Sequence, residues 1–320
     1  MSIRSRLYLP VISFPTAPGG WQAVLFPERR IYRRQLSPLR LGALFVLCTA
    51  LLSAVATFLP ADGWIGFDWV HFFRDANPPA FYPPWTKYVS LLTWPLLVGM
   101  TLAALGLAAF LRARRPLNLL FVFLSLPVLW TVFLGQVDGL ALLGLLAMPY
   151  TPFLVLMKPQ VALFACAARK QYLLSILVFF LFSLVVWGPW PQQLFSVWQV
   201  HAEGRYANDI ALGLWGLPLA AVLAWFSRGD ADMLLLAGAC CTPYLLPYHL
   251  VVAVPALARL SPRAAGLACL LSWLPLSANW LGPGGWWAGW LFVAWVWGCL
   301  AWERYGTGTV NPEEVQDAHA

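Results

Sequence analysis

Long apolar segments alternate with short polar ones along most of this chain. Several of the apolar segments approach the roughly 20 residues that a helix needs to cross the hydrocarbon core of a bilayer. In order, they cover about 41–59, 88–111, 117–134, 172–187, 210–226, 233–246, 250–260, 264–280 and 286–302. The pattern predicts an all-α, polytopic membrane protein with a bundle of about 10 transmembrane helices, or up to about 12 if short or re-entrant helices are counted.

The segment between 135 and 170 does not fit this count simply. The preceding span, 117–134, is expected to run outward, and the basic pair Arg169 and Lys170 places the end of the segment back in the cytoplasm. The segment must therefore cross the membrane an odd number of times. One crossing leaves surplus length, and three crossings would be only about 12 residues each. Pro149, Pro152 and Pro159 interrupt the segment, so we expect broken or re-entrant half-helices.

Composition supports a membrane protein and excludes most soluble classes. Hydrophobic residues make up 61% of the 320 residues and charged residues only 10%, and the mean hydropathy is +0.71. All six cysteines lie in apolar segments without the spacing of metal ligands. The sequence therefore predicts neither a disulfide framework nor a cysteine metal site.

The net charge of +7 follows the positive-inside pattern, so it does not indicate a nucleic-acid partner. We expect a cytoplasmic basic arm over 1–40, a transmembrane domain over 41–302 and a cytoplasmic tail over 303–320. No cleavable signal peptide is evident in the first 38 residues. The expected location is the inner (cytoplasmic) membrane, with both termini in the cytoplasm.

The polar loop GFDWVHFFRDANPPAFYPPW, residues 66–85, stands between two apolar segments on the expected outer face. Asp68 could act as a general base or hold a divalent cation. A short helix would align Asp68, His71 and Arg74 on one face, where Arg74 could pair with a phosphate. An ordinary solvated loop is the alternative, and for the proline-rich part around Tyr82 a structural turn explains the pattern equally well.

Further polar residues occur in later apolar segments. Gln136 follows Gly135, which allows close approach of a neighbour, while Asp138 reads best as the cap of a helix. Lys158 is a cation deep in an apolar region, which indicates an acidic or anionic partner unless its side chain snorkels to the interface. The stretch TPYLLPYH adds Tyr244, Tyr248 and His249 at the same expected level.

In this order, the motifs resemble those of glycosyltransferase family 87, a DUF2029-like group of the GT-C superfamily. The matched residues lie between about 41 and 260 and are Asp68, Tyr82-Pro83-Pro84, Gly135-Gln136, Lys158-Pro159 and Pro247-Tyr248. The acidic-aromatic pattern of the family is matched only loosely by DWVHFF, and no soluble carboxy-terminal domain follows the last span.

The resemblance implies a GT-C-like fold and an inverting hexosyltransferase, often a mannosyltransferase, that uses a polyprenyl-phosphate-linked sugar as donor. It implies that Asp68 is the catalytic base or a metal ligand and that Lys158, with Arg74, neutralises the phosphate that leaves. His71, Tyr82, Gln136, Tyr248 and His249 are expected to bind substrate. The acceptor would be a glycan or a lipid on the outer face of the bilayer.

Two other classes of function remain open at the level of sequence. A transporter or flippase for a lipid-linked or anionic solute would need charged residues along a continuous path through several spans. A non-catalytic membrane partner is the remaining alternative. No cofactor is certain, and a divalent cation at Asp68 stays an alternative.

Overall fold

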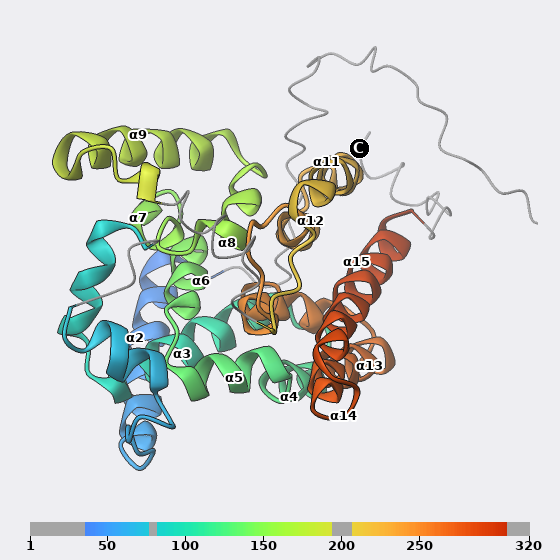
Figure 1. Cartoon of the computed structure of the whole chain (residues 1–320), viewed down its shortest axis with the longest axis horizontal. Helices are drawn as coiled ribbons and strands as arrows, with labels where there is room; N and C mark the ends of the chain where they lie inside the picture. Colours follow the sequence, from blue (N-terminus) through green and yellow to red (C-terminus); the bar gives the residue numbers. More distant parts are fainter. Residues whose placement is uncertain (1–35, 77–81, 194–206, 306–320) are drawn as a thin grey trace, which may run out of the picture.

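The computed structural model describes residues 36–76, 82–193 and 207–305, which form helices and no strands. Most of the expected basic arm and tail, and residues 77–81 of the polar loop, lie outside the described residues. Figure 1 shows α9 at one edge of the molecule and α13, α14 and α15 at the opposite edge, with α6 and α8 between them. The prediction of an all-α chain is confirmed for the described residues.

Helices of very different length make up the chain. The longer ones are α2 (Pro38–Ala56), α3 (Trp94–Arg112), α9 (Lys170–Trp187), α11 (Gly216–Ser227), α12 (Ala231–Cys240), α13 (Pro262–Trp273) and α15 (Gly289–Tyr305). The shorter ones are α4 (Pro116–Phe123), α5 (Leu126–Leu134), α6 (Asp138–Leu146), α7 (Pro152–Val155), α8 (Pro159–Cys166) and α14 (Ala278–Leu281). A π-helical turn, η1 (Trp69–Phe73), and 3₁₀ turns η2 (Pro84–Leu91), η3 (Gly213–Trp215), η4 (Pro247–Val252), η5 (Val254–Arg259), η6 (Leu274–Ser277) and η7 (Pro283–Ala288) complete the described part.

Four helical segments are long and apolar enough to cross a membrane. They are Pro38–Ala56, Trp94–Arg112, Lys170–Trp187 and Pro262–Leu281. A fifth candidate is the pair α4 and α5, which bends by 48° between its two halves. The structure thus supports a membrane protein with four or five candidate spans among the described residues, and the expected count of about ten is not confirmed.

Proline explains where several of the short helices begin. Proline lacks a backbone N–H and is favoured in the first helical turn, where that donor has no partner in the helix. Accordingly Pro116, Pro127, Pro152 and Pro159 lie in the first turn of α4, α5, α7 and α8. The predicted broken half-helices between 135 and 170 are confirmed as α6, α7 and α8.

Two sequence segments expected to be helical arms, 233–246 and 250–260, differ from the prediction. Only the first contains an α-helix, α12, whose N-cap Asp230 accepts hydrogen bonds from the backbone of Asp232 and Met233. The second is formed by the 3₁₀ turns η4 and η5, and each has a proline in its first turn. The prolines Pro247 and Pro255 restrict continuous α-helical hydrogen bonding here.

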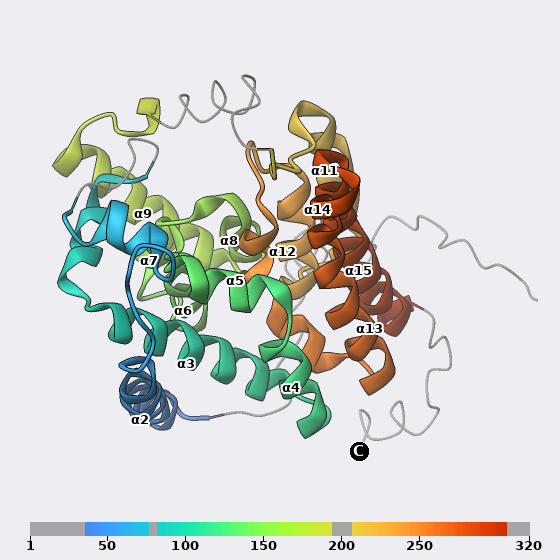
Figure 2. The ribbon, with the colours of Figure 1, turned by 60° about the horizontal axis from the view of Figure 1, so that its bottom comes forward.

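α3 is the central helix that separates two polar regions. It lies against α2, where Gly99 permits contact so close that a Cβ would come within 2.8 Å of backbone atoms of Thr49 and Ser53. Its first residue, Trp94, packs near Gly135 and Trp69, whereas its last residue, Arg112, contacts Asp232. Since 19 residues of α-helix span about 28 Å, these two regions lie at opposite ends of α3. Figure 2 shows α3 running from the α2 side of the molecule toward α4 and α13.

Candidate functional site

Gln136 joins three segments of the chain through its side-chain amide. Its Nε2 donates to Oδ2 of Asp68 and to the hydroxyl of Tyr248, at 3.1 Å for the latter. Its Oε1 accepts a hydrogen bond from the Tyr82 hydroxyl at 3.2 Å. All four side chains are buried. An amide with two donors and one carbonyl oxygen can hold these three partners at once, so Gln136 fixes their relative positions.

Gly135 places this amide. It ends α5 in the left-handed conformation, with φ of 75° and ψ of 42°, which glycine adopts at little cost. A Cβ at this position would lie 2.7 Å from the ring of Trp94 and 2.8 Å from Cβ of Trp69. The predicted close approach at Gly135 is therefore confirmed, and it brings Gln136 next to the polar loop.

Asp68 lies outside the candidate membrane-spanning helices, yet it is only 7% exposed. The loop is anchored nearby, because the N–H of Gly66 donates to the carbonyl of Phe133 at 2.6 Å. Burial raises the pKa of Asp68 to about 6, against the lowering effects of Lys158 and the Gln136 hydrogen bond. A carboxyl group with such a pKa can exchange protons near neutral pH, as a general base must.

His71 and Arg74 do not share the environment of Asp68. The prediction that Asp68, His71 and Arg74 share one face of a helix is wrong, because η1 is a π-helical turn with a different number of residues per turn. In this turn the N–H of Arg74 donates to the carbonyl of Trp69 at 2.7 Å. His71 is exposed, its Nδ1 lies 2.7 Å from the carbonyl oxygen of Phe67, and its ring stacks on the Phe67 ring. Arg74 is also exposed and pairs with Asp75 at 3.2 Å. Both side chains are therefore exposed and make no hydrogen bond to Asp68, although the charge of His71 still acts to lower the pKa of Asp68.

Lys158 enters the cluster from the start of α8. Its Nζ lies 3.7 Å from Oδ2 of Asp138 and 3.2 Å from Nε2 of His249, and the side chain is 4% exposed. The alternative that the Lys158 side chain snorkels to the membrane interface is therefore wrong. The acidic partner expected for Lys158 is Asp138. The assignment of Asp138 as a helix cap is wrong as well, because Val137 is the N-cap of α6 and Asp138 turns toward Lys158.

The His249 ring presents a hydrogen-bond donor to Lys158. The N–H of Leu246 donates to Nδ1 of His249 at 3.2 Å, so the proton of a neutral ring is on Nε2. That N–H faces the ammonium group of Lys158, which also only donates. Two donors that face each other in a buried place favour an acceptor shared between them.

Tyrosine rings enclose the charged groups. The Nζ of Lys158 lies 4.8 Å from the centre of the Tyr82 ring and 5.9 Å from that of Tyr248, within the range of cation–π attraction. The Tyr244 ring packs edge-on against His249 at 5.1 Å. Tyr244 and Asp138 are the members of this cluster that were not among the expected catalytic or substrate-binding residues. Their only signal was the position of Tyr244 in the TPYLLPYH stretch and of Asp138 two residues after Gln136.

We call these residues the buried polar cluster: Asp68, Tyr82, Gln136, Asp138, Lys158, Tyr244, Tyr248 and His249. It contains six of the eight residues that the sequence predicted for the site, and His71 and Arg74 are the two outside it. Within the described ranges, no group of three or more His, Cys, Asp or Glu side chains is arranged to hold a metal ion.

The cluster therefore offers a carboxylate of raised pKa, two facing nitrogen donors and aromatic walls. In comparisons of the chain with protein-family models, with curated proteins and with solved structures, no match was found.

Proposed function

We propose that the protein is a membrane glycosyltransferase that moves a hexose, mannose in type, from a polyprenyl-phosphate donor to a glycan or lipid acceptor. One observation carries the proposal: Asp68 lies in the same buried cluster as Lys158 and His249. Gln136 bonds Asp68 and Tyr248, and the rings of Tyr82 and Tyr248 contact Lys158. The resemblance of the same residues to motifs of glycosyltransferase family 87 supports it. In this proposal, a GT-C-like bundle places the cluster on the outer side of the membrane.

Asp68 acts as the base in this proposal. It takes the proton of the acceptor hydroxyl while the hydroxyl oxygen forms a bond to the anomeric carbon of the sugar. The bond from that carbon to the phosphate oxygen breaks, and its electron pair leaves with the polyprenyl phosphate. Attack opposite to the departing phosphate inverts the anomeric centre.

Lys158 and His249 bind the phosphate of the donor. A phosphate oxygen beside both nitrogens, at hydrogen-bond distance from each, would accept from both donors and relieve the donor–donor contact. The charge on the phosphate increases as it leaves, so these donors stabilise the transition state more than the bound donor. Asp138, beside Lys158, orients the ammonium group.

The distribution of buried charge favours a transferase over a transporter. In the part of the chain that the structure describes, the buried charged residues are Asp68, Asp138 and Lys158 in the buried polar cluster and Arg112, Asp230 and Asp232 in a second network at the last residue of α3. A transport path would need further charged groups that connect these two networks.

The proposal is tested by incubating the purified protein in lipid bilayers with polyprenyl-phosphate sugars and a panel of glycan and lipid acceptors. The wild type should form a glycosylated product, and Lys158→Ala should lose most of the transfer. The control Lys87→Ala removes an exposed lysine of η2 and should keep the wild-type rate. No product from the wild type across the donor panel, or equal transfer by Lys158→Ala, contradicts the proposal.

A further inference from the structure

A groove of about 650 Å³ lies between α13 and α15, and none of its lining residues belongs to the buried polar cluster. The two helices are antiparallel, because Gly289 at the start of α15 faces Pro275 beyond the end of α13, while the Trp295 indole donates to the Ala264 carbonyl at 3.1 Å. The volume of the groove is within the range of sites that bind small ligands. The groove is thus large enough for part of a lipid, at the end of α3 that carries Arg112.

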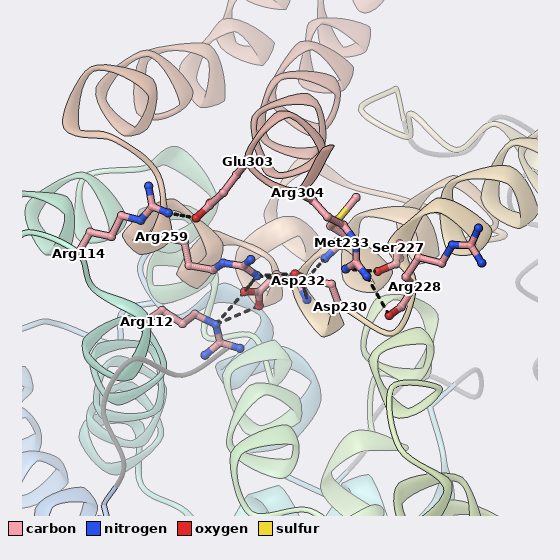
Figure 3. A network of polar contacts seen from close by, with 10 residues as sticks. All are labelled: Arg112, Arg114, Ser227, Arg228, Asp230, Asp232, Met233, Arg259, Glu303 and Arg304. Atoms are coloured by element: carbon pink, nitrogen blue, oxygen red, sulfur yellow. Dashed lines mark hydrogen bonds and ion pairs between the residues drawn. The ribbon is translucent and has the colours of Figure 1, made fainter. Parts of the chain in front are cut away.

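One end of the groove is polar. Arg114 and Glu303 form an ion pair there, which Figure 3 shows above the network of Arg112, Asp232 and Arg259. Ser261, the N-cap of α13, lies at the same end. Since α13 begins the candidate span Pro262–Leu281, this polar end lies where that span would meet the headgroup layer.

The other part of the groove is apolar and open. Ala264 and Ala294 line it together with Trp295. A Cβ built on Gly298 meets no atom within 4 Å, so a small residue leaves free space at this point. An exposed apolar surface next to a candidate membrane span is a place where a hydrocarbon chain of the bilayer can bind.

The charge around the polar end indicates the kind of headgroup. Exposed Arg115 and Arg263 follow the lining residues Arg114 and Ser261 by one and two positions, so they add positive charge near the Arg114–Glu303 ion pair. Basic pockets between membrane helices on the cytoplasmic side attract anionic lipid headgroups. We propose that this groove binds one anionic phospholipid of the bilayer, with its phosphate at Arg114 and an acyl chain along Ala264, Ala294 and Gly298.

The proposal separates the roles of Arg114 and Glu303, although the two residues form one ion pair. Arg114→Gln removes the phosphate ligand and should weaken binding of phosphatidylglycerol by roughly fivefold, with recovery in Arg114→Lys. Glu303→Gln breaks the same ion pair but removes a negative charge, so binding should be equal to or tighter than that of the wild type. A purely structural ion pair would give both variants the same effect.

The test is native mass spectrometry of the detergent-solubilised full chain, titrated with phosphatidylglycerol or phosphatidylcholine. The wild type should retain one phosphatidylglycerol in preference to phosphatidylcholine, and Gly298→Leu should lose it by filling the groove. The matched controls are Gly42→Leu, at an open position on α2, and Arg40→Gln, an exposed arginine of α2. Both controls should bind as the wild type does.

Three results would overturn this assignment. The first is equal retention of the two lipids by the wild type, and the second is unchanged retention in Gly298→Leu. The third is a dimer that Gly298→Leu dissociates, because it would assign the groove to a second copy of the chain. Thermal unfolding of each variant identifies any that does not fold, and in that case Glu303→Gln and Arg114→Lys decide the outcome.

Discussion

Oδ2 of Asp68 accepts a hydrogen bond from Nε2 of Gln136, although the two residues are 68 positions apart. The bond joins the polar loop to the residue that follows α5. It also leaves the second hydrogen of the amide for Tyr248, at 3.1 Å. The orientation of the Asp68 carboxylate therefore depends on a neutral side chain.

Replacing Gln136 with leucine should reduce sugar transfer and lower stability together. The change leaves Asp68, Tyr82 and Tyr248 buried without this partner, at a cost of about 1–3 kcal/mol in the free energy of unfolding for an unpaired buried polar group. Gln192→Leu, at an exposed position, serves as control. Thermal unfolding and transfer rates check the prediction, and wild-type values for Gln136→Leu in both would exclude a positioning role.

The rate of transfer should depend on pH through Asp68. Because burial raises its pKa to about 6, the carboxyl group is protonated and inactive as a base below that pH. The rate should therefore increase as the pH rises toward 6 and level off above it. A pH profile of kcat/KM for the donor tests this, because it reports the pKa of the free enzyme, and a rise centred near pH 4 would show that the working carboxylate is solvated.

Gly135→Ala should impair transfer by displacing Gln136. The added methyl group would meet Trp94 and Trp69 at less than 3 Å. Gly188 is a matched control, because its φ of 69° and ψ of −164° are at least as restrictive for alanine but a Cβ there meets no atom within 4 Å. If Gly188→Ala lost as much activity as Gly135→Ala, backbone strain and not the contact with Trp94 would be the cause.

Asp232→Asn should destabilise the other end of α3. Asp232 pairs with Arg112 at 2.9 Å and with Arg259 at 2.9 Å, and both its side chain and that of Arg112 are buried (Figure 3). Removing one member of a buried ion pair costs about 3–5 kcal/mol, because the remaining charge is uncompensated. Thermal unfolding should show this loss, whereas Asp62→Asn, in an exposed loop, should change little. Equal midpoints for the two variants would contradict this account of the network.

Sequence reasoning located most of the buried polar cluster because polar residues are rare in apolar segments. Gln136 and Lys158 stand out for this reason, and burial gave each of them partners among the predicted residues. His71 and Arg74 were assigned by assuming α-helical spacing. The π-helical turn η1 changes that spacing, and nothing in the local sequence indicates it.

The role of Asp138 depends on contacts that spacing does not predict. An aspartate at a helix start usually caps the helix, so its pairing with Lys158 becomes visible only when the short helices α6 and α8 are placed side by side. The sequence also does not predict how many helices cross the membrane. Hydropathy detects apolar segments, but the proline-started helices in them are mostly shorter than a membrane span.

The rate of sugar transfer by Asp68→Asn, measured in lipid bilayers beside Asp75→Asn, is the most direct test of Asp68 as the base. Asparagine retains the size of the side chain and can still bond Gln136, but it cannot take a proton. Asp75 is a carboxylate of the same loop that lies exposed beside Arg74. The account predicts a loss of at least roughly 100-fold for Asp68→Asn with donor binding retained, and little change for Asp75→Asn. Transfer by Asp68→Asn at the wild-type rate would contradict it.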